Sequence, residues 1–223
     1  MKTRLLAALT AATALAAAGT AHALTVIDFE GDVVGSVAEG FSAAGFPELV
    51  FYSDLGAGLE IGDYDVQSDG KALLAQSDTN GNFIRGEFTD GVHSFLSMTF
   101  GNDDPIFTNP GDRAVLTVFL GGALVGQTFV ILNRNDVMDQ TIAFTSGPFD
   151  SFTFAYTDAA GNPFTGGGGA GVGLIEIIDN ITFDTLSAAI PEPSAWGMMI
   201  LGFGGVGGIL RRRRDLVAAP SRA

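Results

Sequence analysis

Residues 113–132 read RAVLTVFLGGALVGQTFVIL and decide the fold class. Val115, Thr117 and Phe119 alternate with their neighbours, and the same spacing returns in Val125, Gln127 and Phe129 after Gly121-Gly122. Alternation with a period of two is typical of a strand, and a two-residue glycine turn joins antiparallel strands. The segment therefore predicts a β-hairpin.

The same pattern of short alternating runs, separated by Gly, Asn and Asp, continues on both sides of this hairpin. No window of helical length shows an apolar stripe with a period of 3.6. The sequence thus predicts an all-β, two-sheet antiparallel sandwich of jelly-roll type. The expected strands are residues 25–30, 49–52, 59–61, 71–75, 83–88, 95–100, 113–120, 123–132, 140–144, 151–156 and 174–183.

The N-terminus has the composition of a secretory signal peptide. Lys2 and Arg4 precede an apolar stretch at 5–18, and the small residues Ala21 and Ala23 flank His22. This order of features predicts cleavage after Ala23 and export of the chain. Residues 1–23 are therefore set apart from the domain expected at 24–189, which is called the body below.

The body is strongly acidic and free of cysteine. Its four basic residues, Lys71, Arg85, Arg113 and Arg134, stand against 23 Asp and Glu. A field of this sign repels phosphate backbones, so no nucleic-acid partner is expected, whereas divalent cations and neutral sugars remain compatible. The absence of cysteine excludes disulfides, a thiol nucleophile and Cys-bound metals.

Residues 190–214 read IPEPSAWGMMILGFGGVGGILRRRR. The apolar stretch at 195–210 predicts a single short transmembrane helix, and four arginines directly follow it. Basic flanks stay in the cytoplasm, so the body is expected outside and residues 215–223 inside. The expected domains are thus 1–23, 24–189, 190–214 and 215–223.

This tail resembles the PEP-CTERM sorting signal in its PEPxxW variant, which is also catalogued as an ice-binding-protein C-terminal domain. The resemblance implies cleavage near the tripeptide by an exosortase, a transient stay at the inner membrane, and delivery to the cell surface or exopolysaccharide matrix. It leaves open whether the body is released or attached. The residues that carry the resemblance are Pro191, Glu192, Pro193, Trp196, Gly202, Phe203, Gly204, Arg211, Arg212, Arg213 and Arg214.

The two ends of the body show a looser resemblance. The segments at 27–30 (IDFE) and 176–183 (EIIDNITF) are similar to the first and last strands of bacterial jelly-roll modules related to carbohydrate-binding modules. Such modules often hold a structural calcium ion there. The resemblance implies Asp28, Glu30 and Asp179 as its ligands.

Together these features predict a non-catalytic exported protein with a carbohydrate-binding or structural body. A polysaccharide hydrolase and a calcium-dependent lectin are the alternatives. A hydrolase needs two facing carboxylates, which the sequence does not identify among so many acids. His93 lacks a nucleophile elbow and is expected at the surface or a strand edge. Ice binding is named only by the tail, and the body shows no regular threonine array.

Overall fold

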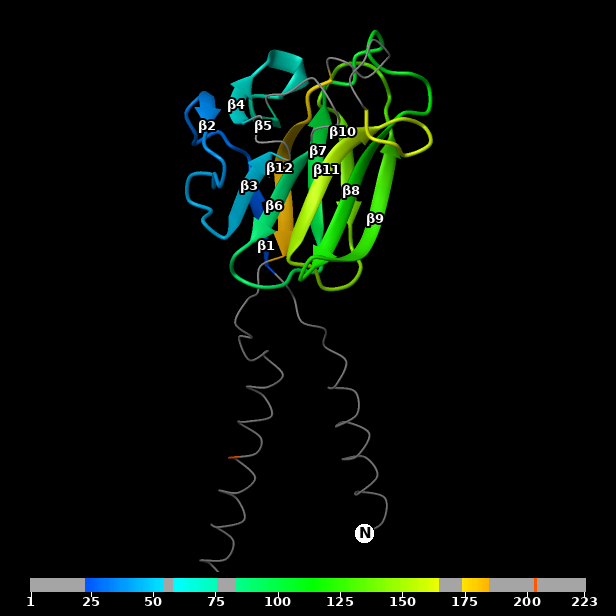
Figure 1. Ribbon diagram of the computed structural model, residues 1–223. Coiled ribbons are helices and arrows are strands. Elements are labelled where there is room, and N and C mark those ends of the chain that lie inside the picture. Colours follow the sequence, from blue (N-terminus) through cyan, green and yellow to red (C-terminus); the bar gives the residue numbers. More distant parts are fainter. Residues whose placement is uncertain (1–22, 54–57, 76–82, 165–173, 185–202, 204–223) are drawn as a thin grey trace, which may run out of the picture. The chain divides into compact units, whose positions relative to one another are not determined.

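The computed structural model describes residues 23–53, 58–75, 83–164, 174–184 and 203. The body is all-β, as expected (Figure 1). A short 3-10 helix, η2 (Asp65–Gln67), follows the fourth strand. The strands are β1 (Leu24–Ile27), β2 (Gly35–Val37), β3 (Leu49–Ser53), β4 (Leu59–Asp63), β5 (Lys71–Ala75), β6 (Ile84–Phe88), β7 (Leu96–Gly101), β8 (Arg113–Leu120), β9 (Ala123–Ile131), β10 (Gln140–Phe144), β11 (Ser151–Thr157) and β12 (Ile177–Asp184).

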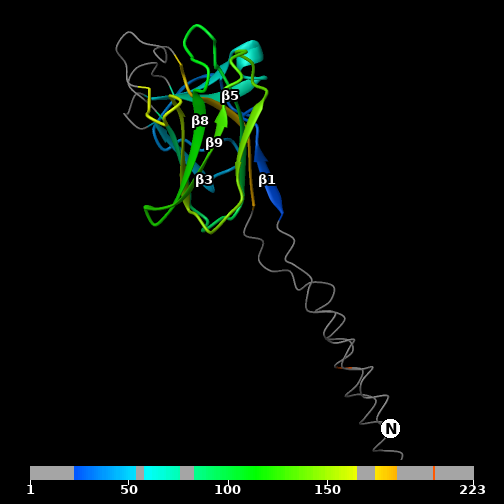
Figure 2. The same ribbon diagram turned by 90° about the vertical axis from the view of Figure 1, so that its right-hand side faces the viewer.

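The strands form two antiparallel sheets, which Figure 2 shows as facing layers. One sheet has the order β10-β7-β12-β5-β4-β2, with β1 also paired to β12, and the other has the order β3-β6-β11-β8-β9. Leaving out β2 to β5 gives the four-stranded sheets β1-β12-β7-β10 and β6-β11-β8-β9. Apart from the hairpin β8–β9, successive strands of this set then alternate between the sheets. This is the arrangement of a jelly roll, which confirms the predicted fold.

The core lies between the two sheets and is filled by the inward residues of each strand. In β11, for example, Phe152, Phe154 and Tyr156 are fully buried, whereas Ser151 and Thr153 point to the other side. This alternation follows from the period-two geometry of a strand. Other large core residues are Phe29, Phe51, Phe100, Phe149 and Phe183, with Leu49, Leu59, Ile61, Leu96, Leu116 and Ile181 between them.

The first and last strands of the body lie side by side. Leu24 pairs with Asp184 and Ile27 pairs with Ile181 in the β1–β12 ladder. Both ends of the body therefore leave the sandwich at the same pole (Figure 1). Since β12 also pairs with β5 and β7, it is the strand that joins the start of the body to the rest of its sheet.

Several strand limits differ from the expected ones. β1 ends at Ile27 rather than at residue 30, because Phe29 adopts a positive φ of 55° and its carbonyl accepts the Asp32 N–H at 3.0 Å. β12 begins at Ile177 rather than at residue 174. β2 was not predicted, since its sequence Gly-Ser-Val is too short to show alternation.

No helix among the described residues is long and apolar enough to cross a membrane. The span expected at 195–210 lies outside those residues except for Phe203.

Candidate functional site

The outer face of the five-stranded sheet carries a row of polar side chains, called here the polar row. Because Phe152 and Phe154 of β11 point into the core, Thr153 between them points outward. The strand register places one outward residue of each neighbouring strand beside it. The row consists of Tyr52 (β3), Arg85 (β6), Thr153 (β11), Thr117 (β8) and Gln127 (β9).

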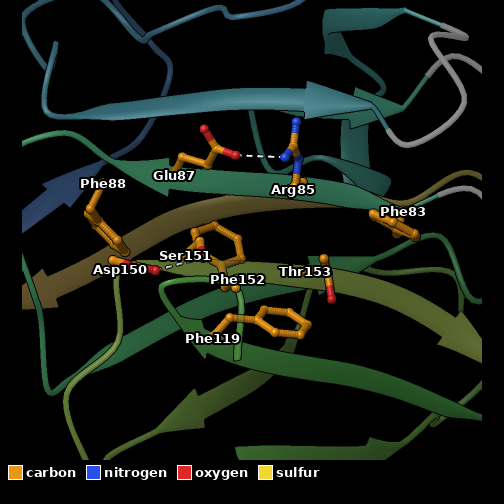
Figure 3. Close-up of a pocket in the computed structure, with 10 residues that line it drawn as sticks. Phe83, Arg85, Glu87, Phe88, Phe119, Asp150, Ser151, Phe152 and Thr153 are labelled. Atoms are coloured by element: carbon orange, nitrogen blue, oxygen red, sulfur yellow. Dashed lines mark hydrogen bonds and ion pairs between the residues drawn. The ribbon is translucent and has the colours of Figure 1, made fainter. Parts of the chain in front are cut away.

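A first hollow of ≈ 480 Å³ lies over β6, β11 and β8. Figure 3 shows Arg85 and Glu87 beside each other on β6, with Thr153 and Phe119 coming from the two next strands. The Arg85 guanidinium pairs with the Glu87 carboxylate at 2.6 Å, and both side chains are nearly half exposed. The hollow therefore combines a charged donor, a charged acceptor, a hydroxyl and an aromatic ring.

A second hollow of ≈ 190 Å³ adjoins the first, because Phe83 and Thr153 line both. Its polar wall includes Arg113, Gln127 and Thr117. The Gln127 Nε2 donates to the Thr117 Oγ1 at 2.9 Å, which fixes the orientation of the amide. The two hollows together form a surface on which hydroxyl groups could exchange hydrogen bonds along the polar row.

Aromatic rings accompany these polar groups. Phe129 is 51% exposed, and the Arg113 guanidinium lies over its ring at 4.3 Å from the centroid. The Arg85 guanidinium lies in the same way over Tyr52, at 4.5 Å. Such cation–π contacts hold the guanidinium planes in place. The sheet face thus offers preoriented donors between apolar rings.

The alternation within single strands does not reveal this face. Phenylalanine is usually a core residue, whereas Phe83, Phe119 and Phe129 line the two hollows. One signal was available, since Phe119 and Phe129 share the alternation of Thr117 and Gln127. Alternation shows that a strand has two different faces, but only the packing of the two sheets decides which face points inward.

The three residues predicted to bind calcium come close enough to interact electrostatically. Asp179 lies on β12 and is 2% exposed, whereas Asp28 and Glu30 follow the end of β1. Burial, together with the nearby carboxylates of Asp28, Glu30 and Asp69, raises the pKa of Asp179 to about 7. Asp69 is an additional acid near Asp179.

The detailed contacts of these acids are less favourable for a metal. The Asp179 Oδ2 accepts a hydrogen bond from Asn180, but its buried Oδ1 has no partner. The Glu30 Oε1 already accepts the backbone N–H of Lys71 at 2.8 Å, and the Asp28 Oδ1 accepts that of Glu30 at 3.2 Å. Within the described part of the chain, no three acidic or histidine side chains are arranged to hold a metal ion. The calcium site therefore stays a prediction.

His93 is buried, at 1% exposure, and not a surface residue. It does lie at a strand edge, in an isolated bridge with Phe149. Its Nδ1 contacts the Asp184 carbonyl and its Nε2 lies 3.0 Å from the Asp90 carboxylate. The neighbouring Ser94 hydroxyl donates to the Asp184 carboxylate at 2.6 Å. Since that hydroxyl is directed to an acid rather than to the imidazole, these residues lack the geometry of a serine nucleophile and its base.

The residues expected to direct processing lie almost entirely outside the described part of the chain. Ala23 is described, and Ala21 is not. Of the tail residues, only Phe203 is described, in helical conformation and 74% exposed. The sorting hypothesis therefore depends on sequence comparison.

Residues 189–214 match the model of the PEP-CTERM protein-sorting motif. The chain carries this sorting signal. The PEP-CTERM motif implies an exported protein that an exosortase processes, as the resemblance of the tail predicted. No curated protein matches the chain in sequence.

Three solved structures illustrate what the body is similar to. They are the K2 cleaved adhesin domain of Lys-gingipain (TM-score 0.41), the family 32 carbohydrate-binding module of C. perfringens NanJ in complex with galactose (0.37), and a DUF4465 family protein from Bacteroides ovatus (0.39). The similar region covers 73%, 73% and 75% of this chain and 100% of each of the others, at 12% identity in each case. A likeness at this level of identity concerns the fold alone.

Proposed function

We propose that the body of this PEP-CTERM protein is a non-catalytic carbohydrate-binding module, delivered by its sorting signal to the cell surface or the exopolysaccharide matrix. Binding takes place on the outer face of the five-stranded sheet, in the two hollows along the polar row. The exosortase acts on the tail near Pro191, Glu192 and Pro193, after a transient stay at the inner membrane.

The polar row supports this proposal most directly. A sugar ring presents hydroxyl groups at its rim and C–H groups on its faces, so a protein surface that binds it needs both hydrogen-bonding side chains and apolar rings. The face supplies the first through Arg85, Thr153 and Gln127, and the second through Phe119 and Phe129. Because both hollows lie on the sheet surface between outward side chains, an extended polysaccharide chain can lie across them.

A hydrolase is the weaker alternative. Glu87 and Asp150 both line the first hollow, but the carboxylate of Glu87 is paired with Arg85 and that of Asp150 accepts hydrogen bonds from Gly121 and Ser151. Both carboxylates are therefore engaged in contacts within the protein. A glycosidase instead needs one carboxyl group that keeps its proton to act as the general acid.

The proposal is tested by affinity electrophoresis of the full-length chain against a panel of polysaccharides. Thr153→Leu removes the hydroxyl that both hollows share and fills the space between them. We expect this variant to lose at least about tenfold in affinity, which corresponds to about 1.4 kcal/mol.

Thr141→Leu is the matched control, since Thr141 is exposed on β10 of the other sheet. It should migrate like the wild type in every gel. Equal retardation of Thr153→Leu and wild type on a polysaccharide that binds would place the binding site elsewhere, and absence of retardation on every polymer would contradict the proposed function.

A further inference from the structure

The four basic side chains of the body have different environments, and three are already engaged. The Lys71 ammonium donates to the carbonyls of Glu30 and Asp32, both at 2.8 Å. The Arg134 guanidinium donates to the carbonyls of Pro105 and Thr108. Arg85 pairs with Glu87. These three cations therefore stabilise the fold or neutralise a neighbouring charge.

Arg113 is the exception. It begins β8 and lies beside Thr157 of β11 and Ile131 of β9. Within the described residues, no carboxylate pairs with its guanidinium, and its buried Nε has no hydrogen-bond partner. A buried donor without an acceptor is unfavourable and the charge of Arg113 is not compensated, so an anion bound beside the guanidinium would be stabilising.

The position of this guanidinium is fixed by its contact with the Phe129 ring at 4.3 Å. Arg113 also lines the second hollow, together with Gln127 and Thr117. A planar guanidinium held in one orientation can donate two parallel hydrogen bonds to a carboxylate. The second hollow therefore has a charged donor whose natural acceptor is an anion with two oxygens.

We propose that the second hollow binds the carboxylate of a uronic acid unit, so that the ligand of this module is an acidic polysaccharide. The inference rests on the proposed function, because it names the ligand class of the same face. The guanidinium of Arg113 binds the carboxylate, and the amide of Gln127 forms a hydrogen bond with a neighbouring hydroxyl. The first hollow, where Arg85 is neutralised by Glu87, takes an uncharged part of the chain.

The acidic charge of the rest of the body does not prevent this. At an ionic strength of 0.15 M, electrostatic interactions between exposed charges are screened over about 8 Å. The carboxylates of distant loops therefore act weakly on a ligand that lies in direct contact with Arg113. Two acidic residues, Glu87 and Asp150, lie nearer the face, and both line the first hollow. Glu87 is paired with Arg85, and Asp150 accepts hydrogen bonds from Gly121 and Ser151.

The test compares polymers that differ only in the carboxyl group. Polygalacturonate, alginate and hyaluronan are each presented to the full-length chain beside their carboxyl-reduced forms, in which every uronate is converted to the neutral sugar. Dissociation constants are measured at fixed salt. We expect at least one acidic polymer to bind about tenfold more tightly than its reduced form, and Arg113→Gln to remove this difference while changing the affinity for reduced polymer less than twofold.

Lys71→Gln is the control for net charge, because it removes one positive charge from the other sheet. It should leave the preference for the acidic polymer intact. Loss of the preference in Lys71→Gln to the same extent as in Arg113→Gln would show a general charge effect and overturn the inference. Binding of dextran sulfate as tight as that of the uronates would do the same, since it would replace carboxylate recognition by attraction to any anion.

Two further outcomes separate this inference from the proposed function. Equal binding of acidic and reduced polymers, weakened by Thr153→Leu but not by Arg113→Gln, would overturn the uronate assignment and leave carbohydrate binding in place. Absence of binding to every polymer of both series would contradict both.

Discussion

At the scale of single residues, the most unusual group is the carboxyl of Glu176, just before β12. It is 4% exposed, its Oε1 lies 3.5 Å from the Tyr156 N–H, and its buried Oε2 has no partner. Burial raises its pKa from 4.5 to about 8. A buried carboxyl without a cation beside it is more stable with its proton on.

This pKa makes the stability of the body depend on pH. Between about pH 4.5 and pH 8 the folded chain keeps a proton on Glu176 that the unfolded chain loses. The contribution of Glu176 to the free energy of unfolding is therefore fully present below pH 4.5 and is lost as the pH rises to about 8. We expect the melting temperature to fall by on the order of 5 °C between pH 5 and pH 8.

Glu176→Gln should reduce that pH dependence, because the amide has no proton to lose, and the part that comes from Asp179 should remain. Glu48→Gln, the same substitution at a partly exposed position, should keep the wild-type profile. Thermal unfolding followed by circular dichroism at both pH values makes the comparison. A Glu176→Gln variant with an unchanged pH profile would show that Glu176 does not titrate in this range.

The sequence could predict only part of this residue-level picture. The absence of cysteine and the acidic surplus follow from counting, and Thr153 could be placed outward from its phenylalanine neighbours. In contrast, the partners of Arg113 and the burial of Glu176 and His93 depend on loops and strands far away in the chain. A pattern within one segment carries no information on those distant contacts.

At the scale of elements, the closure of β1 and β5 on β12 brings four carboxylates near one another: Asp28, Glu30, Asp69 and Asp179. Their repulsion opposes the closure, and a calcium ion would cancel it with oxygen ligands of the kind it prefers. We expect about 1 mM calcium to raise the melting temperature of the full-length chain by several degrees, a concentration in the range typical of extracellular calcium modules.

The matched variants are Asp179→Asn and Asp158→Asn. Asp158 lies in the loop after β11 and its hydrogen bonds are to that loop, so its replacement should leave the calcium effect unchanged. Asp179→Asn should abolish the effect and raise stability without calcium. A melting temperature that calcium does not change would refute the predicted site and indicate that the buried Asp179 is simply protonated.

Most of the elements could be predicted, because alternation and turn residues act locally. The hairpin β8–β9 is the clearest case, with its turn at Gly121 and Gly122 as predicted. The ends of β1 and β12 were placed less well, since Phe29 leaves the extended conformation to close a turn that depends on tertiary contacts. The order of strands within each sheet follows from packing and could be predicted only as a fold type.

At the scale of the whole molecule, the signal peptide and the PEP-CTERM motif together predict a mature chain that lacks both ends. Intact-mass spectrometry of the protein from its native host should show an N-terminus at Leu24 and a C-terminus near residues 191–193. In a host without the exosortase, the C-terminal residues should remain. A mature protein that still carries Arg211, Arg212, Arg213 and Arg214 in the normal host would contradict processing by this route.

The account depends above all on carbohydrate binding by the open face of the five-stranded sheet. The most direct measurement is the dissociation constant of the full-length chain for exopolysaccharide from the native host, for the wild type and for the double variant Phe119→Ala/Phe129→Ala. The control, Ile106→Ala, removes an exposed apolar side chain from a loop that does not line the hollows. The account predicts saturable binding by the wild type and the control, and a loss of at least about tenfold in the double variant. Equal affinity of all three, or no binding by the wild type, would contradict it.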